Sequence, residues 1–163
     1  MYLHWTGDDY HTVFPAYHFC VALGDDGRPI AIATHDLRAN MRDVRVGDAP
    51  YAAHTRGRNS HAIGVSVCGM RDARPHDFGA FALRDDMVAA MCVLVADLCR
   101  AYAIVPSART IVTHAEAALA DGYFGCDDEQ RWDIARLLPE PRPLVASDAR
   151  DVGDGLRERI ARA

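Results

Sequence analysis

The sequence lacks the long apolar runs and the basic clusters that mark several large classes of protein. No stretch approaches the roughly 20 apolar residues that a membrane-spanning helix needs, so membrane insertion is not expected. The 163 residues carry a formal charge of -5, and the basic residues are arginines scattered among acidic ones. Such a chain presents no electrostatic footprint for nucleic acid, and no nucleic-acid partner is expected.

The cysteines show no C-x-x-C pair and are odd in number, which argues against a disulfide framework. This pattern is typical of reduced, mostly buried thiols in a protein made in the cytosol. The five residues are Cys20, Cys68, Cys92, Cys99 and Cys126. The opening M-Y-L-H-W contains neither the basic segment nor the apolar segment of a secretory signal. We therefore expect synthesis in the cytoplasm without a signal peptide, and another route to any target outside it.

Length and composition favour one α/β domain over residues 1–163, because a chain of this size with 50% hydrophobic residues supports one sizeable core. Short apolar runs bounded by turn residues predict strands, and D-D-G between two of them predicts a hairpin. The expected strands are residues 2–5, 16–23, 28–33, 63–68 and 110–113. We expect them to form a central mixed sheet flanked by helices.

One strong helical pattern follows. Apolar residues recur at intervals of three or four from Asp85 to Tyr102, which predicts a helix with one core-facing side. Residues 134–138 predict a short helical piece before a proline-rich stretch, and residues 152–163 predict a terminal helix beyond a core of about 2–138. The polar segment 34–60 is expected to wall a groove, and a Gly-rich acidic loop is expected after His114.

Three residues are the best candidates for a metal site, because each adjoins an apolar strand or helix end that can hold it rigidly. They are His4, His114 and Asp133. Zinc in hydrolases takes three protein ligands and leaves the fourth position to water. The chain has no compact H-E-x-x-H motif, and Cys126 is an alternative third ligand, so spacing alone leaves the ligand set open.

Four blocks in order resemble those of the zinc-dependent N-acetylmuramoyl-L-alanine amidases, the family that includes phage amidase-type lysozymes and peptidoglycan recognition proteins. The blocks are L-H-W-T-G, A-Y-H-F-x-V-x-L-G-D-D-G, A-A-H-T-R-x-x-N-S-x-A-I-G-V-S-V-C-G-M, and T-H-A-E followed by R-W-D-I. The resemblance covers roughly residues 2–138, and its specificity lies in the order of the blocks.

The resemblance implies a role for each matching residue. His4, His114 and Asp133 would bind one zinc ion in a groove at one end of the sheet. Tyr17 and Arg131 would be catalytic, with Arg131 stabilising the oxyanion.

His54 and Asn59 match the family segment that lines the substrate groove, where they would bind sugar or stem-peptide groups. His18 and Glu116 are candidates for supporting roles beside the metal, with a surface position as the alternative for Glu116. Two features depart from the family. Ser66 stands where some relatives carry a glutamate base, and Arg131 replaces the usual lysine.

The implied function is hydrolysis of the amide between N-acetylmuramic acid and L-alanine, with peptidoglycan or a muropeptide as substrate. We expect a monomeric, antimicrobial endolysin or another wall-lytic enzyme that a holin or an equivalent export route releases to the cell wall. The alternative is a non-catalytic peptidoglycan-binding recognition module. A cysteine hydrolase using Cys20 or Cys68 is disfavoured, because both lie in apolar strands expected to pack in the core.

Overall fold

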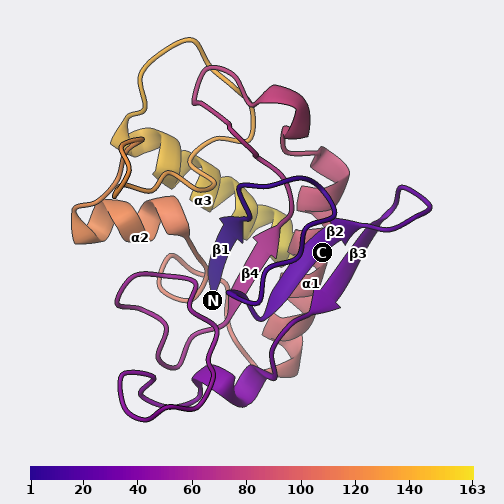
Figure 1. The fold of residues 1–163 in the computed structure, drawn as a ribbon, viewed down its shortest axis with the longest axis vertical. Helices are drawn as coiled ribbons and strands as arrows, with labels where there is room; N and C mark the ends of the chain where they lie inside the picture. The colour runs from indigo at the N-terminus through magenta and orange to yellow at the C-terminus, as the bar shows by residue number, and fades with distance from the viewer.

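A computed structural model describes all residues from 1 to 163, and its centre is a five-stranded mixed sheet (Figure 1). The strand order is β3-β2-β4-β1-β5. The strands are β1 (Tyr2–Trp5), β2 (Phe19–Leu23), β3 (Pro29–Ala33), β4 (Gly64–Val67) and β5 (Val112–Thr113). β1 pairs in parallel with β4 and β5, β2 pairs in parallel with β4, and β2 and β3 form the expected antiparallel hairpin.

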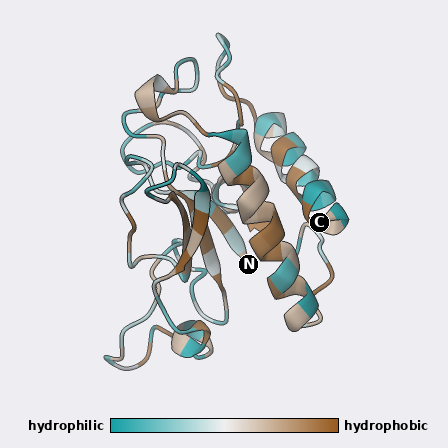
Figure 2. Cartoon of the chain, turned by 90° about the vertical axis from the view of Figure 1, so that its right-hand side faces the viewer, coloured by the Kyte–Doolittle hydropathy of each residue, from teal (hydrophilic) through white to brown (hydrophobic).

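Three α-helices and two 3-10 turns complete the fold. They are α1 (Asp85–Ala101), α2 (His114–Asp121), α3 (Ala146–Arg162), η1 (Leu37–Asn40) and η2 (Gly79–Phe81). Helix α1 packs against β2, β3 and β4, and α3 packs against the outside of α1 and against α2 (Figures 1 and 2). No helix is both long and apolar enough to cross a membrane.

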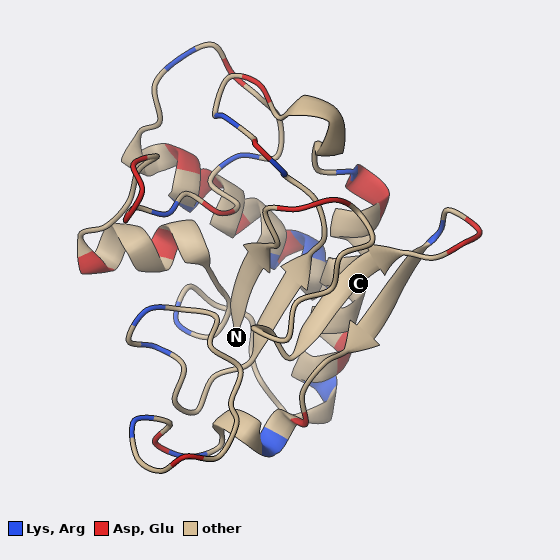
Figure 3. Cartoon of the chain, in the orientation of Figure 1, with Lys and Arg blue, Asp and Glu red and all other residues tan.

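The core lies between the sheet and α1, because the strands are built from uncharged residues and α1 presents an apolar face to them. The strands carry no Lys, Arg, Asp or Glu, and the charges are distributed over helices and loops (Figure 3). Met87, Met91 and Leu98 of α1 are buried, as the spacing of apolar residues predicts, whereas Tyr102 at the end of the predicted stripe is exposed. Leu156 and Ile160 of α3 extend the same cluster.

The structure corrects the expectation of a loop directly after His114, because residues 114–121 form α2. Thr113 caps this helix by accepting a hydrogen bond from the backbone N–H of Glu116, while the Glu116 carboxylate accepts one from the backbone N–H of Thr113. This capping box and the alanines that follow favour a helix. Glu116 is therefore a structural residue of the helix start.

Two expectations for the C-terminal part are also wrong: one expected helix does not form, and the other begins earlier than expected. Residues 134–138 form turns, and the terminal helix begins at Ala146, six residues before the expected start. Arg136 is the physical reason for the turns, because its buried guanidinium pairs with Asp148 of α3 and donates to the carbonyl of Pro75 and to three carbonyls of the proline-rich stretch. The proline-rich stretch wraps around the Arg136 guanidinium. A helix over residues 134–138 would take the Arg136 side chain away from these partners.

Helix α3 approaches α2 closely at Gly153. A Cβ atom at this position would lie 2.4 Å from the carboxylate of Glu116. That carboxylate forms an ion pair with Arg157 of α3, whose Nη2 lies 2.8 Å from Glu116 Oε1. Arg157 also donates to the carbonyl of Ile111, just before β5. The contact fixes α2 and β5 against the last helix.

Candidate metal centre

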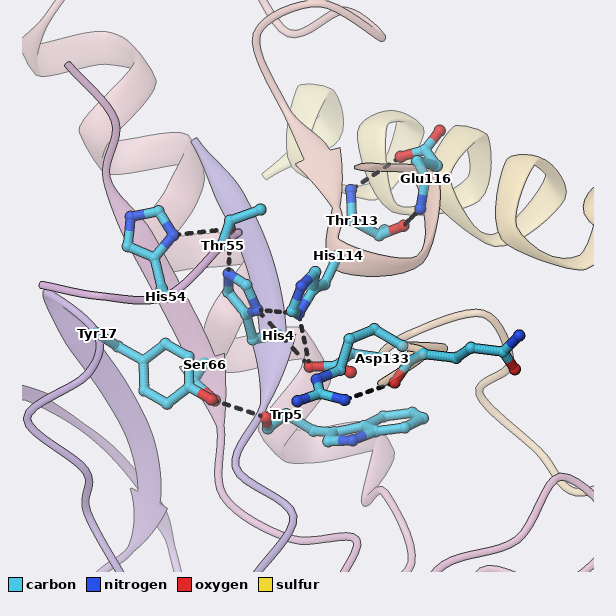
Figure 4. A network of polar contacts seen from close by, with 12 residues as sticks. His4, Trp5, Tyr17, His54, Thr55, Ser66, Thr113, His114, Glu116 and Asp133 are labelled. Carbon is cyan, nitrogen blue, oxygen red and sulfur yellow. Dashed lines mark hydrogen bonds and ion pairs between the residues drawn. The ribbon is translucent and has the colours of Figure 1, made fainter. Parts of the chain in front are cut away.

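The three predicted ligands come together at the edge of the sheet where β1, β5 and α2 meet (Figure 4). His4 lies in β1, His114 is the first residue of α2, and Asp133 lies in the loop that follows α2. The parallel register pairs Leu3 of β1 with Thr113 of β5, and the residue that follows each of them is a histidine, His4 or His114. The backbone N–H of Ala115 donates to the carbonyl of Asp133 at 3.0 Å and brings the third ligand to the same place.

The donor atoms converge on one point. His4 Nδ1 lies 3.1 Å from His114 Nδ1, His114 Nδ1 lies 3.1 Å from Asp133 Oδ2, and His4 Nδ1 lies 3.7 Å from Asp133 Oδ2. Ligand atoms of a tetrahedral zinc ion with bonds of about 2.0–2.1 Å lie roughly 3.3 Å apart. The three separations bracket this value, so the residues fit a metal ion of that size. Two nitrogens and one carboxylate oxygen are also a common donor set for catalytic zinc.

Burial and mutual contacts set the protonation states of His4 and Asp133. The exposed fractions of His4, His114 and Asp133 are 0%, 6% and 8%. Burial lowers the pKa of His4 to about 4, so its imidazole is neutral near pH 7. Burial alone would raise the pKa of Asp133, but the hydrogen bond with His114 and the nearby imidazole of His4 outweigh it and hold this pKa well below its usual value. Neutral imidazole and ionised carboxylate are the forms that bind metals.

Tyr17 lies beside the centre, with its ring 5.1 Å from the ring of His4 between centroids. Its hydroxyl donates to the carbonyl of Trp5 at 3.2 Å. Burial raises the pKa of Tyr17, so the phenol keeps its proton at any physiological pH. Tyr17 is therefore a hydrogen-bond donor next to the ligands and is not a base.

Arg131 lines a cavity of about 250 Å³ that reaches the centre at His114. Its side chain is exposed, and Nη1 donates to the backbone carbonyls of Asp128 and Gln130 in its own loop. The structure thus places Arg131 at the entrance to the centre, with its remaining guanidinium N–H groups unpaired.

His54 and Asn59 line the same cavity, as does His114. Asn59 Oδ1 accepts hydrogen bonds from the backbone N–H groups of His54 and Thr55 at 3.0 and 2.8 Å, so its carbonyl oxygen holds the loop together. The segment expected to wall a groove does so through this loop. Thr55 stands in the A-A-H-T-R block without an expected role, and its hydroxyl contacts both His4 and His54.

The remaining candidates lie elsewhere. Cys126 is exposed and does not belong to the group of ligand atoms. Cys20 and Cys68 are fully buried in the core. His18 is buried and its Nδ1 accepts a hydrogen bond from the backbone N–H of Gly64, which makes it a support of β4. A larger cavity of about 780 Å³ beside η1 shares no lining residue with the centre.

Comparison with known proteins gives one match. A family model described as N-acetylmuramoyl-L-alanine amidase matches residues 2–133. This range begins before the first ligand and ends on the third. No curated protein and no solved structure matches the chain.

Proposed function

Because the chain belongs to the N-acetylmuramoyl-L-alanine amidase family, we propose that it is a zinc-dependent hydrolase cleaving the amide between N-acetylmuramic acid and L-alanine of peptidoglycan. One observation carries the zinc dependence. The donor atoms of His4, His114 and Asp133 lie within 4.8 Å of one another in a buried position, and His114 also lines an open cavity. A site of three protein ligands beside a cavity is the arrangement of a catalytic zinc.

His4, His114 and Asp133 would hold the ion. When bound, zinc supplies Lewis acidity that polarises the amide carbonyl and activates water. The cavity that His114 lines would admit the scissile amide, and the buried His4 and Asp133 would keep the other side of the centre away from bulk solvent. Electrostatic contacts formed at the cavity are therefore stronger than they would be in water.

Arg131 would stabilise the negative charge that develops on the amide oxygen. Its guanidinium keeps its charge at any relevant pH, so it serves as an electrostatic donor and not as a proton donor. The two carbonyls that it now contacts belong to the exposed loop around it, so turning the side chain toward the cavity exchanges only surface hydrogen bonds.

Tyr17 would donate a hydrogen bond at the same place. Its neutral phenol turns from the Trp5 carbonyl to the substrate oxygen, and the raised pKa keeps its proton in place. Residue 66 of β4 is a serine and is fully buried, so this position supplies no carboxylate base. His54 and Asn59 would contact the sugar or the stem peptide from the cavity wall.

The assay follows the release of new L-alanine amino termini from purified peptidoglycan. We expect activity that a chelator abolishes and added zinc restores. Unchanged release after removal of the metal would refute the metalloamidase. Binding of peptidoglycan without any release would support the recognition module instead.

A matched pair of variants tests the ligand set. Asp133→Ala should lose both metal and turnover, because it removes one of the three converging donors. Cys126→Ala should keep both, because Cys126 is exposed and lies outside the group. The reverse result would make Cys126 the third ligand.

The proposal includes a lytic role at the cell wall after release from the cytoplasm, since the substrate is the wall polymer. Cells that express the protein should lyse when the inner membrane is permeabilised, as a holin would do, and should stay intact otherwise. Lysis without permeabilisation would indicate that the protein reaches the wall by another route.

A further inference from the structure

We propose that Thr55 is a positioning residue that links His4 to His54 and fixes the tautomers of both rings, an inference that rests on the proposed zinc site. The three side chains form a continuous chain of contacts that leads away from the metal centre into the cavity wall (Figure 4). Neither the family resemblance nor the ligand set assigns a role to Thr55.

The chain begins at the second nitrogen of His4. Nδ1 of this ring faces the other two ligand atoms, so a bound metal takes its lone pair and the ring hydrogen lies on Nε2. Nε2 lies 3.3 Å from Thr55 Oγ1. The ring is fully buried, and the Thr55 oxygen is the acceptor that the Nε2 hydrogen meets. Metal-bound histidines generally donate their other N–H in this way, which fixes the ring orientation.

The direction of the next hydrogen bond follows from the chemistry of a hydroxyl. Thr55 has one hydrogen to donate. Because its oxygen accepts from His4, that hydrogen points to His54 Nδ1, which lies 2.9 Å away. The His54 ring is buried and packs against the rings of His4 and His18, an environment that favours the neutral imidazole with a single hydrogen. With Nδ1 accepting, that hydrogen must lie on Nε2.

The surrounding loop is built to hold this arrangement. The Asn59 carboxamide binds the backbone N–H groups of both His54 and Thr55. Asn40 in turn donates to the carbonyl of Asn59 at 2.8 Å and exchanges hydrogen bonds with the backbone of Ala52. At Gly64 of β4, a Cβ atom would lie 2.5 Å from the His54 ring, so glycine leaves the space that the ring fills.

Two consequences follow. The Thr55 hydroxyl keeps His4 in the tautomer whose Nδ1 lone pair faces the metal, so it contributes to metal affinity. It also leaves His54, a residue of the cavity wall, as a neutral ring with its hydrogen on Nε2.

Zinc affinity and histidine tautomers test the proposal in the intact chain. Thr55→Val removes the hydroxyl at nearly constant shape and should weaken zinc binding about 10- to 100-fold in competition with a chelator. Thr55→Ser keeps the hydroxyl and should stay within a few-fold of wild type. Thr110→Val is the matched control, because it removes a hydroxyl that binds the Val105 carbonyl outside the centre.

Nitrogen-15 NMR of the zinc-loaded wild-type protein gives a readout that needs no variant. We expect the His54 hydrogen on Nε2 and the His4 hydrogen on Nε2. A hydrogen on His54 Nδ1, or a Thr55→Val protein that binds zinc as tightly as wild type, would overturn the proposal while leaving the zinc amidase intact. Failure of the wild-type chain to bind zinc would overturn both.

Discussion

Helix α3 contains two glycines that differ only in what surrounds them, and they allow a test of how the last helix supports the centre. A Cβ atom at Gly153 would lie 2.4 Å from the carboxylate of Glu116, whereas a Cβ atom at Gly155 meets nothing within 4 Å. The same substitution to alanine should therefore change stability in opposite directions. Glu116 is the sensitive partner because it caps α2 directly behind His114.

The magnitude at Gly153 combines two terms of opposite sign. Alanine in a helix interior is favoured over glycine by about 1 kcal/mol. Displacing the Glu116 carboxylate breaks its pair with Arg157, and breaking a buried pair costs about 3–5 kcal/mol. The side chains of Arg157 and Glu116 retain 10% and 13% exposure, so the lower end of that range applies. The net expectation is a loss of about 2 kcal/mol for Gly153→Ala.

Thermal unfolding of the purified variants measures both effects. For a chain of this size 1 kcal/mol corresponds to about 2–4 °C in Tm, so Gly153→Ala should lower Tm by about 4–8 °C. Gly155→Ala should raise Tm by about 2–4 °C, because it gains helix propensity without a contact. Equal stability of the two variants would refute the close packing of α3 on Glu116.

The remaining predictions concern the metal centre and pH. Zinc at 100 times its Kd should stabilise wild type and Cys126→Ala by about 2.7 kcal/mol in thermal unfolding, and should leave Asp133→Ala unchanged; equal shifts in all three would contradict the assigned ligands. Arg131→Ala should bind zinc normally but lose about 10²- to 10³-fold in kcat, whereas full turnover would remove its oxyanion role. In chelator, stability should fall as the pH drops from about 6.5 toward 4, because burial holds the pKa of His18 at about 4 while the unfolded residue takes up a proton near 6.5. Melting curves at pH 7 and 5 check this, and a flat profile would contradict it.

The strands and the first helix could be predicted from the sequence because local patterns decide them. The apolar run at residues 2–5 is short and bounded by a turn, and the three-and-four spacing of α1 has one structural solution. The prediction failed at α2, although T-H-A-E contains the capping-box spacing and is followed by helix-forming alanines. The glycines and acidic residues that follow this motif predict a loop, and they conflict with the helix signal.

The residues of the metal centre could be predicted, but the hydrogen bonds around them could not. The resemblance identified three residues that the structure brings together. It did not reveal that Arg131 binds the carbonyls of its own loop or that Thr55 joins two histidines. Both depend on the path of irregular segments, which long-range packing determines and no local periodicity records.

The spacing of the ligands along the chain has a consequence for the fold as a whole. His4 and His114 are separated by 110 positions, and His114 and Asp133 by 19. An ion held by all three would tie the first strand to the last third of the folded chain, and because the unfolded chain does not hold the ligands together, the free energy of binding would stabilise the folded state. The centre would then stabilise the packing of β1, β5 and α2 as well as carry the reaction, and loss of the ion would destabilise these three elements together.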